Sequence, residues 1–173
     1  MADVYRKISV EFTRPVGGVP ILSWVIRLVQ RTTYSHCRLS WLGAGGRVPV
    51  VYEASGSYLK FMGPHAIRNR PAKVMVSYPF DLNKTQYGQL VELCMTYAGV
   101  DYGKKQLLGI GIARVFGLKK NPFADGRRSQ VCSEIIGIFI NKILNIDTNL
   151  DLDIAGPKEI NNFLHNNYGR IVK

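Results

Sequence analysis

The sequence lacks any long hydrophobic run, any internal repeat and any segment of low complexity. A helix that spans a bilayer needs about 20 consecutive apolar residues. The most apolar stretch, residues 17–29, is interrupted by Pro20, Ser23 and Arg27, so we interpret it as a buried or half-buried helix. Because 46% of the 173 residues are hydrophobic, the chain should fold, as a single domain over residues 1–173, rather than stay disordered.

The amino terminus also lacks the pattern of a secretion signal. Residues 1–7 lead directly into the strand-like residues 8–12, without a charged and then apolar leader. We therefore expect a protein that is cytoplasmic as synthesised. Cysteine is scarce, and the three present do not have the spacing of a metal site: Cys37, Cys94 and Cys132. We expect free thiols in a reducing compartment, with no metal and no other cofactor.

Acidic residues are few, with 12 against 23 basic residues and a formal net charge of +11. Such an excess favours anionic partners, which include nucleic acid, acidic lipid and anionic cell-wall polymer. No nucleic-acid-binding module is recognised, so a sequence-reading function is not predicted. The alternative explanation is a solvated basic face. Basic residues gather in two segments: Lys60, Arg68, Arg70 and Lys73, then Lys104, Lys105, Arg114, Lys119, Lys120, Arg127 and Arg128.

Strand-like segments come first in the chain and helical segments follow, a pattern typical of an α+β fold in which helices pack on an antiparallel sheet. Glycine-rich residues 43–46 predict a hairpin link between the second and third strands, and residues 119–130 predict a loop. We expect a core over about 7–145 and a C-terminal helical extension over 146–173. The predicted strands are 7–13, 35–42, 48–54 and 73–78, and the predicted helices are 20–31, 84–98, 104–116, 129–144 and 157–165.

Cys132 lies two or three residues into a predicted helix, directly after a polar loop. The free N–H groups and the positive dipole end at that position stabilise a thiolate. The same N–H groups can bind the oxyanion of an acyl-transfer intermediate. The alternative is a small buried core residue. Cys94, in the middle of a helix on its apolar face, fits that alternative.

His36 lies near the start of a predicted strand and is the candidate base for Cys132. Strand alternation places His36 and Arg38 on one face of the sheet. Cys37 is therefore not the predicted nucleophile, although it adjoins His36. It shares the opposite face with Leu39 and Trp41.

Glu53 ends an apolar strand, where a carboxylate is costly unless it is paired. If residues 35–42 pair with 48–54 as a hairpin, Glu53 returns beside His36. A third group at that position holds the ring orientation and tautomer of a catalytic histidine. The alternative is a strand-end carboxylate that faces water. His65 and His165 are alternative bases if the strands pair differently, although His165 is expected to face solvent.

Four short motifs together resemble the circularly permuted branch of the NlpC-type papain-like superfamily, in which the histidine strand precedes the cysteine helix. The resemblance spans about residues 7–145 and implies a permuted papain-like fold. It also implies that Cys132 is the nucleophile, His36 the base and Glu53 the group that orients His36. Arg38 stands where small or apolar residues are more usual. The motifs are Ser35-His36-Cys37-Arg38-Leu39, Val51-Tyr52-Glu53-Ala54-Ser55, Asp101-Tyr102-Gly103 and Val131-Cys132-Ser133-Glu134-Ile135-Ile136.

The resemblance implies a cysteine peptidase or amidase that acts on cell-wall (peptidoglycan) peptides or another amide or ester substrate. Because no leader is seen, wall chemistry would need another route, such as carriage in a phage particle or release by lysis. Three residues beside the implied catalytic ones are expected to shape the substrate pocket: Tyr34, Tyr52 and Ser133.

Two other functions remain open. The first is a lipid acyltransferase or esterase of the lecithin retinol acyltransferase-like branch. The apolar residues 107–112 and their basic neighbours suit an anionic membrane surface, although we interpret that helix as ordinary core. The second is a non-enzymatic structural component, for example of a phage virion, that keeps the fold.

Overall fold

A computed structural model describes residues 4–17, 21–43, 46–55, 57–123 and 129–172. Within these residues the fold is α+β, with one sheet of seven strands in the order β5-β1-β2-β3-β4-β6-β7. Neighbouring strands are antiparallel except β6 and β7, which are parallel. The strands are β1 (Arg6–Pro15), β2 (His36–Leu42), β3 (Pro49–Ser55), β4 (Tyr58–Met62), β5 (Ala72–Leu82), β6 (Asp101–Tyr102) and β7 (Ser129–Gln130).

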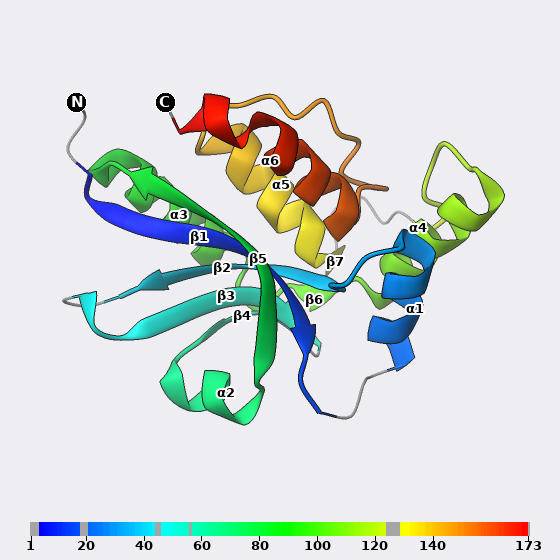
Figure 1. Cartoon of the computed structure of the whole chain (residues 1–173), viewed down its shortest axis with the longest axis horizontal. Helices are drawn as coiled ribbons and strands as arrows, with labels where there is room; N and C mark the ends of the chain where they lie inside the picture. Colours follow the sequence, from blue (N-terminus) through cyan, green and yellow to red (C-terminus); the bar gives the residue numbers. More distant parts are fainter. Residues whose placement is uncertain (1–3, 18–20, 44–45, 56, 124–128, 173) are drawn as a thin grey trace.

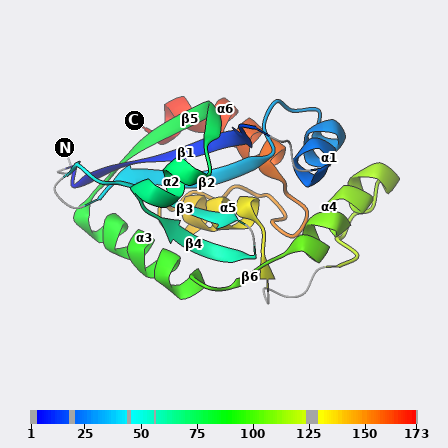
Figure 2. The ribbon, with the colours of Figure 1, turned by 90° about the horizontal axis from the view of Figure 1, so that it is seen from below.

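The described helices are distributed around this sheet, with α3 near one end of β1 and β5 (Figure 1). Helices α5 and α6 stack on one side of it, and α2 lies on the other side. Helices α1 and α4 lie together at one end of the molecule (Figures 1 and 2). None of the described helices combines the length and apolarity needed to cross a bilayer. They are α1 (Ile21–Gln30), α2 (Pro64–Asn69), α3 (Lys84–Tyr97), α4 (Lys104–Phe116), α5 (Cys132–Lys142) and α6 (Pro157–Ile171).

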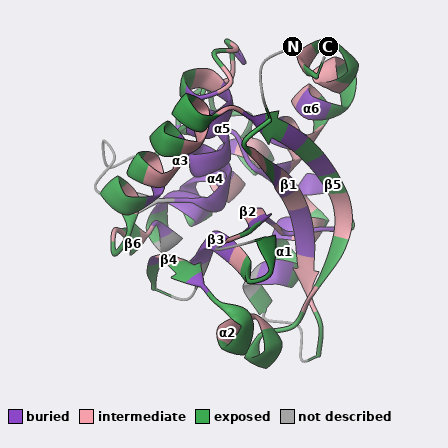
Figure 3. Cartoon of the chain, turned by 90° about the vertical axis from the view of Figure 1, so that its left-hand side faces the viewer, coloured by how far each residue is buried: buried purple, intermediate pink, exposed green. Residues whose placement is uncertain are grey.

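The core lies between the sheet and α5. Alternate residues of β1, Ile8, Val10 and Phe12, are fully buried, as the alternation of apolar residues predicts. They face α5, whose residues from Cys132 to Ile140 are all buried, and Figure 3 shows this helix as buried along its length. Helix α5 therefore has no solvent-exposed face until its last turn.

Most of the predicted elements are confirmed, and the differences have physical causes. Strand β5 continues through Pro79 to Leu82 instead of ending at residue 78, since β5 is an edge strand, where proline costs no ladder hydrogen bond. Four short elements, β4, α2, β6 and β7, were not predicted. Helix α6 extends beyond residue 165 to Ile171 and contributes Ile160 and Leu164 to the main core. Helix α6 is therefore part of the core and not an appended extension.

Some sequence predictions fall partly on residues outside the described ranges. These are Pro20 at the start of the first helix, residues 44–45 of the hairpin link, and residues 124–128 of the loop before Cys132. The hairpin itself is confirmed, because β2 pairs antiparallel with β3 in the register Leu39 with Tyr52.

The prediction that residues 104–116 are ordinary core is correct for one face of α4 only. Leu107, Ile110 and Ala113 are buried, whereas Leu108 and Phe116 are 58% and 72% exposed. An apolar helix that is exposed on one side requires a separate explanation.

Candidate active site

Cys132 is the first residue of α5. The sequence predicted a helix start at Ser129 or Gln130, but these two residues instead pair with β6 as β7. The helix begins at Cys132 because the Glu134 carboxylate accepts a hydrogen bond from the Val131 N–H at 2.7 Å, half of a capping box. Gln106 of α4 donates to the other oxygen of Glu134 at 2.9 Å. The buried Glu134 carboxylate therefore fixes the position of the Cys132 backbone.

His36 is the first residue of β2. The residue before it, Ser35, is anchored by a 2.6 Å hydrogen bond between its hydroxyl and that of Ser23 in α1. Nε2 of His36 lies 3.3 Å from Oε2 of Glu53. The structure thus brings Glu53 to His36, as the hairpin predicts.

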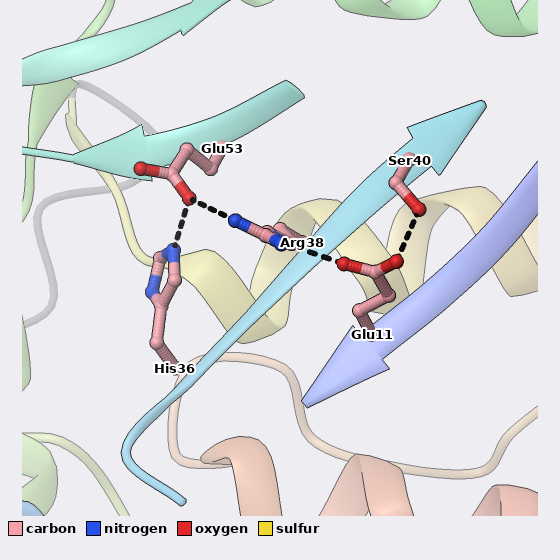
Figure 4. A network of polar contacts seen from close by, with 5 residues as sticks. All are labelled: Glu11, His36, Arg38, Ser40 and Glu53. Carbon is pink, nitrogen blue, oxygen red and sulfur yellow. Dashed lines mark hydrogen bonds and ion pairs between the residues drawn. The ribbon is translucent and has the colours of Figure 1, made fainter. Parts of the chain in front are cut away.

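Glu53 belongs to a row of charged residues across three strands (Figure 4). Glu11 pairs with Arg38 across β1 and β2, and the β2–β3 register places Arg38 opposite Glu53. Nε of Arg38 donates to Oε2 of Glu11 at 2.8 Å, and its NH1 lies 3.9 Å from Oε2 of Glu53. The Ser40 hydroxyl completes the row by donating to Glu11 at 2.6 Å.

This row explains the unusual arginine in the histidine strand. The side chains of Arg38 and Glu53 are each 8% exposed, and a buried carboxylate needs a cation or several hydrogen bonds. Arg38 supplies one cation to two carboxylates, those of Glu11 and Glu53. His36 supplies a second one to Glu53 when it is protonated.

The Cys132 thiol has a pKa well below its ordinary value. A hydrogen bond from the Cys37 thiol contributes most to this lowering, while burial opposes it by disfavouring the charged thiolate. The charge of His36, a hydrogen bond from His36 and one from the Cys37 backbone N–H lower the pKa further. The surroundings of Cys132 therefore favour the thiolate, the reactive form of cysteine.

His36 shows the complementary shift. Burial alone would lower its pKa, but the charge of Cys132 and hydrogen bonds with Cys132 and Glu53 raise it to about 10. The raised pKa of His36 and the lowered pKa of Cys132 mean that each group favours the charged form of the other. Because Nε2 faces Glu53, Nδ1 is the ring nitrogen left for Cys132.

Cys37 has a role that the sequence analysis did not give it. It lies in the core with Leu39 and Trp41, on the face that strand alternation predicts, but α5 packs on that face and brings Cys132 to it. Burial and then contact with Cys132 raise the pKa of Cys37 well above its ordinary value. Cys37 is thus the protonated hydrogen-bond donor and Cys132 the thiolate.

Tyr102 of β6 is a second residue that sequence reasoning did not select. Burial raises the pKa of its phenol, and electrostatic interactions with Cys132, Cys37 and Glu53 raise it further. These interactions place Tyr102 next to the site as a neutral hydroxyl at neutral pH. The signal was present in the Asp101-Tyr102-Gly103 motif, although nothing in that motif indicated a side-chain role.

Of the three predicted pocket residues, only Ser133 adjoins the site in the structure. Its hydroxyl is buried without a hydrogen-bond partner, directly after Cys132. Tyr52 is 1% exposed and packs on Phe61, on the opposite side of β3 from Glu53. Tyr34 is buried against Phe12, and burial first of all raises its pKa to about 12.

The alternative bases and Cys94 lie away from these contacts. His65 and His165 are exposed, and the His65 ring contacts the Asn69 amide within α2. Burial raises the pKa of Cys94 to about 12, which suits a core thiol in α3.

Access to the site is more open at His36 than at Cys132. Cys132 is 3% exposed, whereas the His36 side chain is 20% exposed. A cavity of about 550 Å³ opens on the sheet face that carries the charged row, and Glu11, Arg38 and Ser40 line it. This cavity lies on the opposite face of β2 from Cys37, against which Cys132 packs in the core.

Comparison with known proteins gives a likeness of fold alone. No family model matches the sequence, and no curated protein matches it. Among solved structures, metalloprotein yiiX from Escherichia coli O157:H7 has a TM-score of 0.51 and 17% sequence identity, over 96% of this chain and 83% of that chain.

The word metalloprotein applies to that neighbour. In the part of the chain that the structure describes, no three His, Cys, Asp or Glu residues gather as a metal site would need. The donor set here does not fit a metal ion, and we assign none of the chemistry below to one.

The lowered pKa of Cys132 predicts its reaction with iodoacetamide. We expect the alkylation rate of Cys132 to stay nearly constant through neutral pH and to fall only in acid, where the thiolate is protonated. In His36→Ala and in Cys37→Ala the pKa of Cys132 should rise toward the ordinary thiol value of about 8.5. The alkylation rate of these variants should therefore increase with pH across the neutral range. Peptide mass spectrometry measures each thiol separately, and Cys94→Ala is the matched control. A parent protein whose Cys132 titrates as an ordinary thiol would contradict this assignment.

The charged row predicts a stability effect at Arg38. Replacing Arg38 by Met leaves the half-buried Glu11 carboxylate without its cation and the buried Glu53 carboxylate with His36 alone, which should lower the free energy of unfolding by about 3–5 kcal/mol. Adding Glu11→Gln to Arg38→Met should recover part of that loss. As a control, Arg68→Met alone, on the exposed face of α2, should change the free energy of unfolding by less than about 0.5 kcal/mol. Urea denaturation measures the free energy of unfolding of all three variants. A loss below about 1 kcal/mol in Arg38→Met would mean that the carboxylates are solvated.

Proposed function

We propose that the protein is a cysteine hydrolase that acts by thiolate acyl transfer on amide bonds, with cell-wall peptides as the substrate class. The observation that carries the proposal is the position of His36 between two partners. It interacts with Cys132 on one side and lies 3.3 Å from Glu53 on the other. A nucleophile, a base and a group that orients the base are the minimum set for this chemistry.

The proposed reaction begins with attack of the Cys132 thiolate on the carbonyl carbon of the amide. The first N–H groups of a helix have no partner within it, so those of Cys132 and Ser133 are available to bind the oxyanion. His36, protonated at the start, gives its proton to the leaving amine as the C–N bond breaks. A thioester on Cys132 remains.

Hydrolysis of the thioester returns the site to its starting state. The now neutral His36 takes a proton from water as the water oxygen attacks the thioester carbonyl. The carboxylic acid leaves, Cys132 is again a thiolate and His36 is again protonated. Glu53 keeps its charge throughout and stabilises the protonated imidazole.

One observation favours a second candidate, a lipid acyltransferase or esterase. Helices α1 and α4, which flank the site, expose large apolar side chains such as Trp24 and Phe116. Thiolate attack serves an ester as well as an amide, so the site chemistry is the same in both. A structural virion component with this fold is the third alternative, and the complete Cys–His–Glu set speaks against it.

Substrate assays test the proposal. The protein is incubated with purified peptidoglycan sacculi or with phospholipid, and mass spectrometry detects released peptides or fatty acids. We expect release from sacculi, and Cys132→Ala should abolish it. His36→Ala should slow it by roughly 10²–10⁴-fold and Glu53→Gln by roughly 10–100-fold. Cys94→Ala should retain it.

The outcomes separate the three candidates. Release of fatty acid alone, lost in Cys132→Ala, would replace the amide substrate by a lipid ester. Turnover of neither substrate, with unchanged function of the particle or cell after Cys132→Ala, would favour the structural role and contradict the proposal.

A further inference from the structure

Helix α1 carries an exposed apolar stripe. Ile21, Trp24, Val25 and Leu28 are 82%, 55%, 39% and 60% exposed, and their spacing places them on one face of the helix. The opposite face is buried and includes Ile26. A helix at a water-exposed surface normally has polar residues on its outer face, whereas the outer face of α1 is apolar and two of its buried residues, Ser23 and Gln30, are polar.

Helix α4 repeats this arrangement. Leu108, Ile112, Val115 and Phe116 have the spacing of one helix face, and Leu108, Val115 and Phe116 are exposed. An apolar groove of about 240 Å³ runs between the two helices, lined by Val25 and Val29 on one side and by members of the α4 stripe on the other. The two stripes therefore form one continuous surface, the α1–α4 apolar face (Ile21, Trp24, Val25, Leu28, Leu108, Ile112, Val115 and Phe116).

The charged residues within and directly after the two helices are all basic, and one of them, Arg114, is paired with Glu159 of α6. Residues 21–33 and 102–123 contain no Asp or Glu. Arg31 follows α1, Lys105 lies in the first turn of α4, and Lys119 and Lys120 follow it, all of them exposed. An apolar stripe bordered by Lys and Arg is the composition of elements that lie in the interface of an anionic membrane.

We propose that the α1–α4 apolar face docks on the surface of an anionic lipid membrane. The stripes would enter the boundary between headgroups and acyl chains while the bordering cations contact lipid phosphates. A second copy of the chain fits less well, because pairing two such faces would bring their cations together. The proposal goes beyond the proposed function and would stand even if Cys132 were inert.

The face lies one layer of residues from the site. Ser23 of α1 bonds to Ser35, which precedes His36. Val131, which precedes Cys132, packs with Ile26, Leu107 and Ile110 from the inner sides of the two helices. Docking would therefore hold the Cys132 end of α5 close to the bilayer surface.

Vesicle sedimentation of the full chain tests this directly. We expect binding to vesicles of phosphatidylcholine and phosphatidylglycerol in equal parts, little binding to phosphatidylcholine alone, and release as salt screens the charges. Tryptophan fluorescence supplies a second measurement, since the chain has two tryptophans. Trp24 is exposed and Trp41 is buried, so a blue shift on binding that is lost in Trp24→Phe would place α1 in the lipid.

Variants test the two halves of the face separately. Leu28→Ser with Phe116→Ser removes two exposed apolar side chains and should abolish binding without unfolding the protein. Lys119→Gln with Lys120→Gln should weaken binding by roughly an order of magnitude or more. The matched controls on α3, Met95→Ser and Lys84→Gln, remove an exposed apolar and an exposed basic side chain and should bind like the parent. Cys132→Ala should also bind like the parent, which separates this test from that of the proposed function.

Two results would overturn the proposal. One is no binding to the anionic vesicles at low salt. The other is dimerisation in light scattering that Leu28→Ser with Phe116→Ser abolishes, without vesicle binding, which would assign the face to a second copy of the chain.

Discussion

The pairing of the Glu53 carboxylate with two cations on β2 is the constraint on which the site depends. His36 and Arg38 both reach Oε2 of Glu53, and they can do so only in one register of the β2–β3 hairpin. A slip by one residue would turn both cations toward the core and Cys37 and Leu39 away from it. The charged row therefore selects the register that also delivers Cys37 to α5. The pairing of β2 with β3 therefore also brings together His36, Arg38 and Glu53 of the candidate site.

Helix α5, which begins at Cys132, packs on this hairpin and is buried over nearly all of its length. A buried helix start needs partners for its first N–H groups and a balance for any charge it carries. Glu134, held by Gln106, provides the hydrogen-bond partner at the helix start. The Cys37 thiol and His36 balance the charge of the Cys132 thiolate. A thiolate at Cys132 is thus stabilised by short-range donors rather than by water. This matches a nucleophile that must stay charged while a substrate excludes solvent.

Local patterns in the sequence were sufficient for the four longest strands, the long helices and the approach of Glu53 to His36, because a hairpin relates two nearby segments by a simple rule. What packs on a strand face is a long-range property, and local patterns do not reveal it. Strand alternation placed Cys37 on the correct face of the sheet. It could not show that Cys132, about a hundred residues later in the chain, would pack against Cys37 on that face. The same limit applies to Tyr102, and to Ser129 and Gln130, which look like helix-capping residues and instead form β7 with a distant segment.

The chemistry that we propose for Cys132 does not by itself choose between an amide and an ester, since a thiolate attacks either carbonyl. The choice depends on which carbonyl can reach the sulfur, and that depends on the surfaces around it. One hollow beside the charged row is lined by Glu11 and Arg38 together with apolar side chains such as Trp41 and Val50. Another is the apolar groove between α1 and α4, which would suit an acyl chain. Both helices contact the residues that precede His36 and Cys132, through Ser35 and Val131. The α1–α4 apolar face is therefore joined to the candidate site by one hydrogen bond and by direct packing, and the same two links would be present with either substrate.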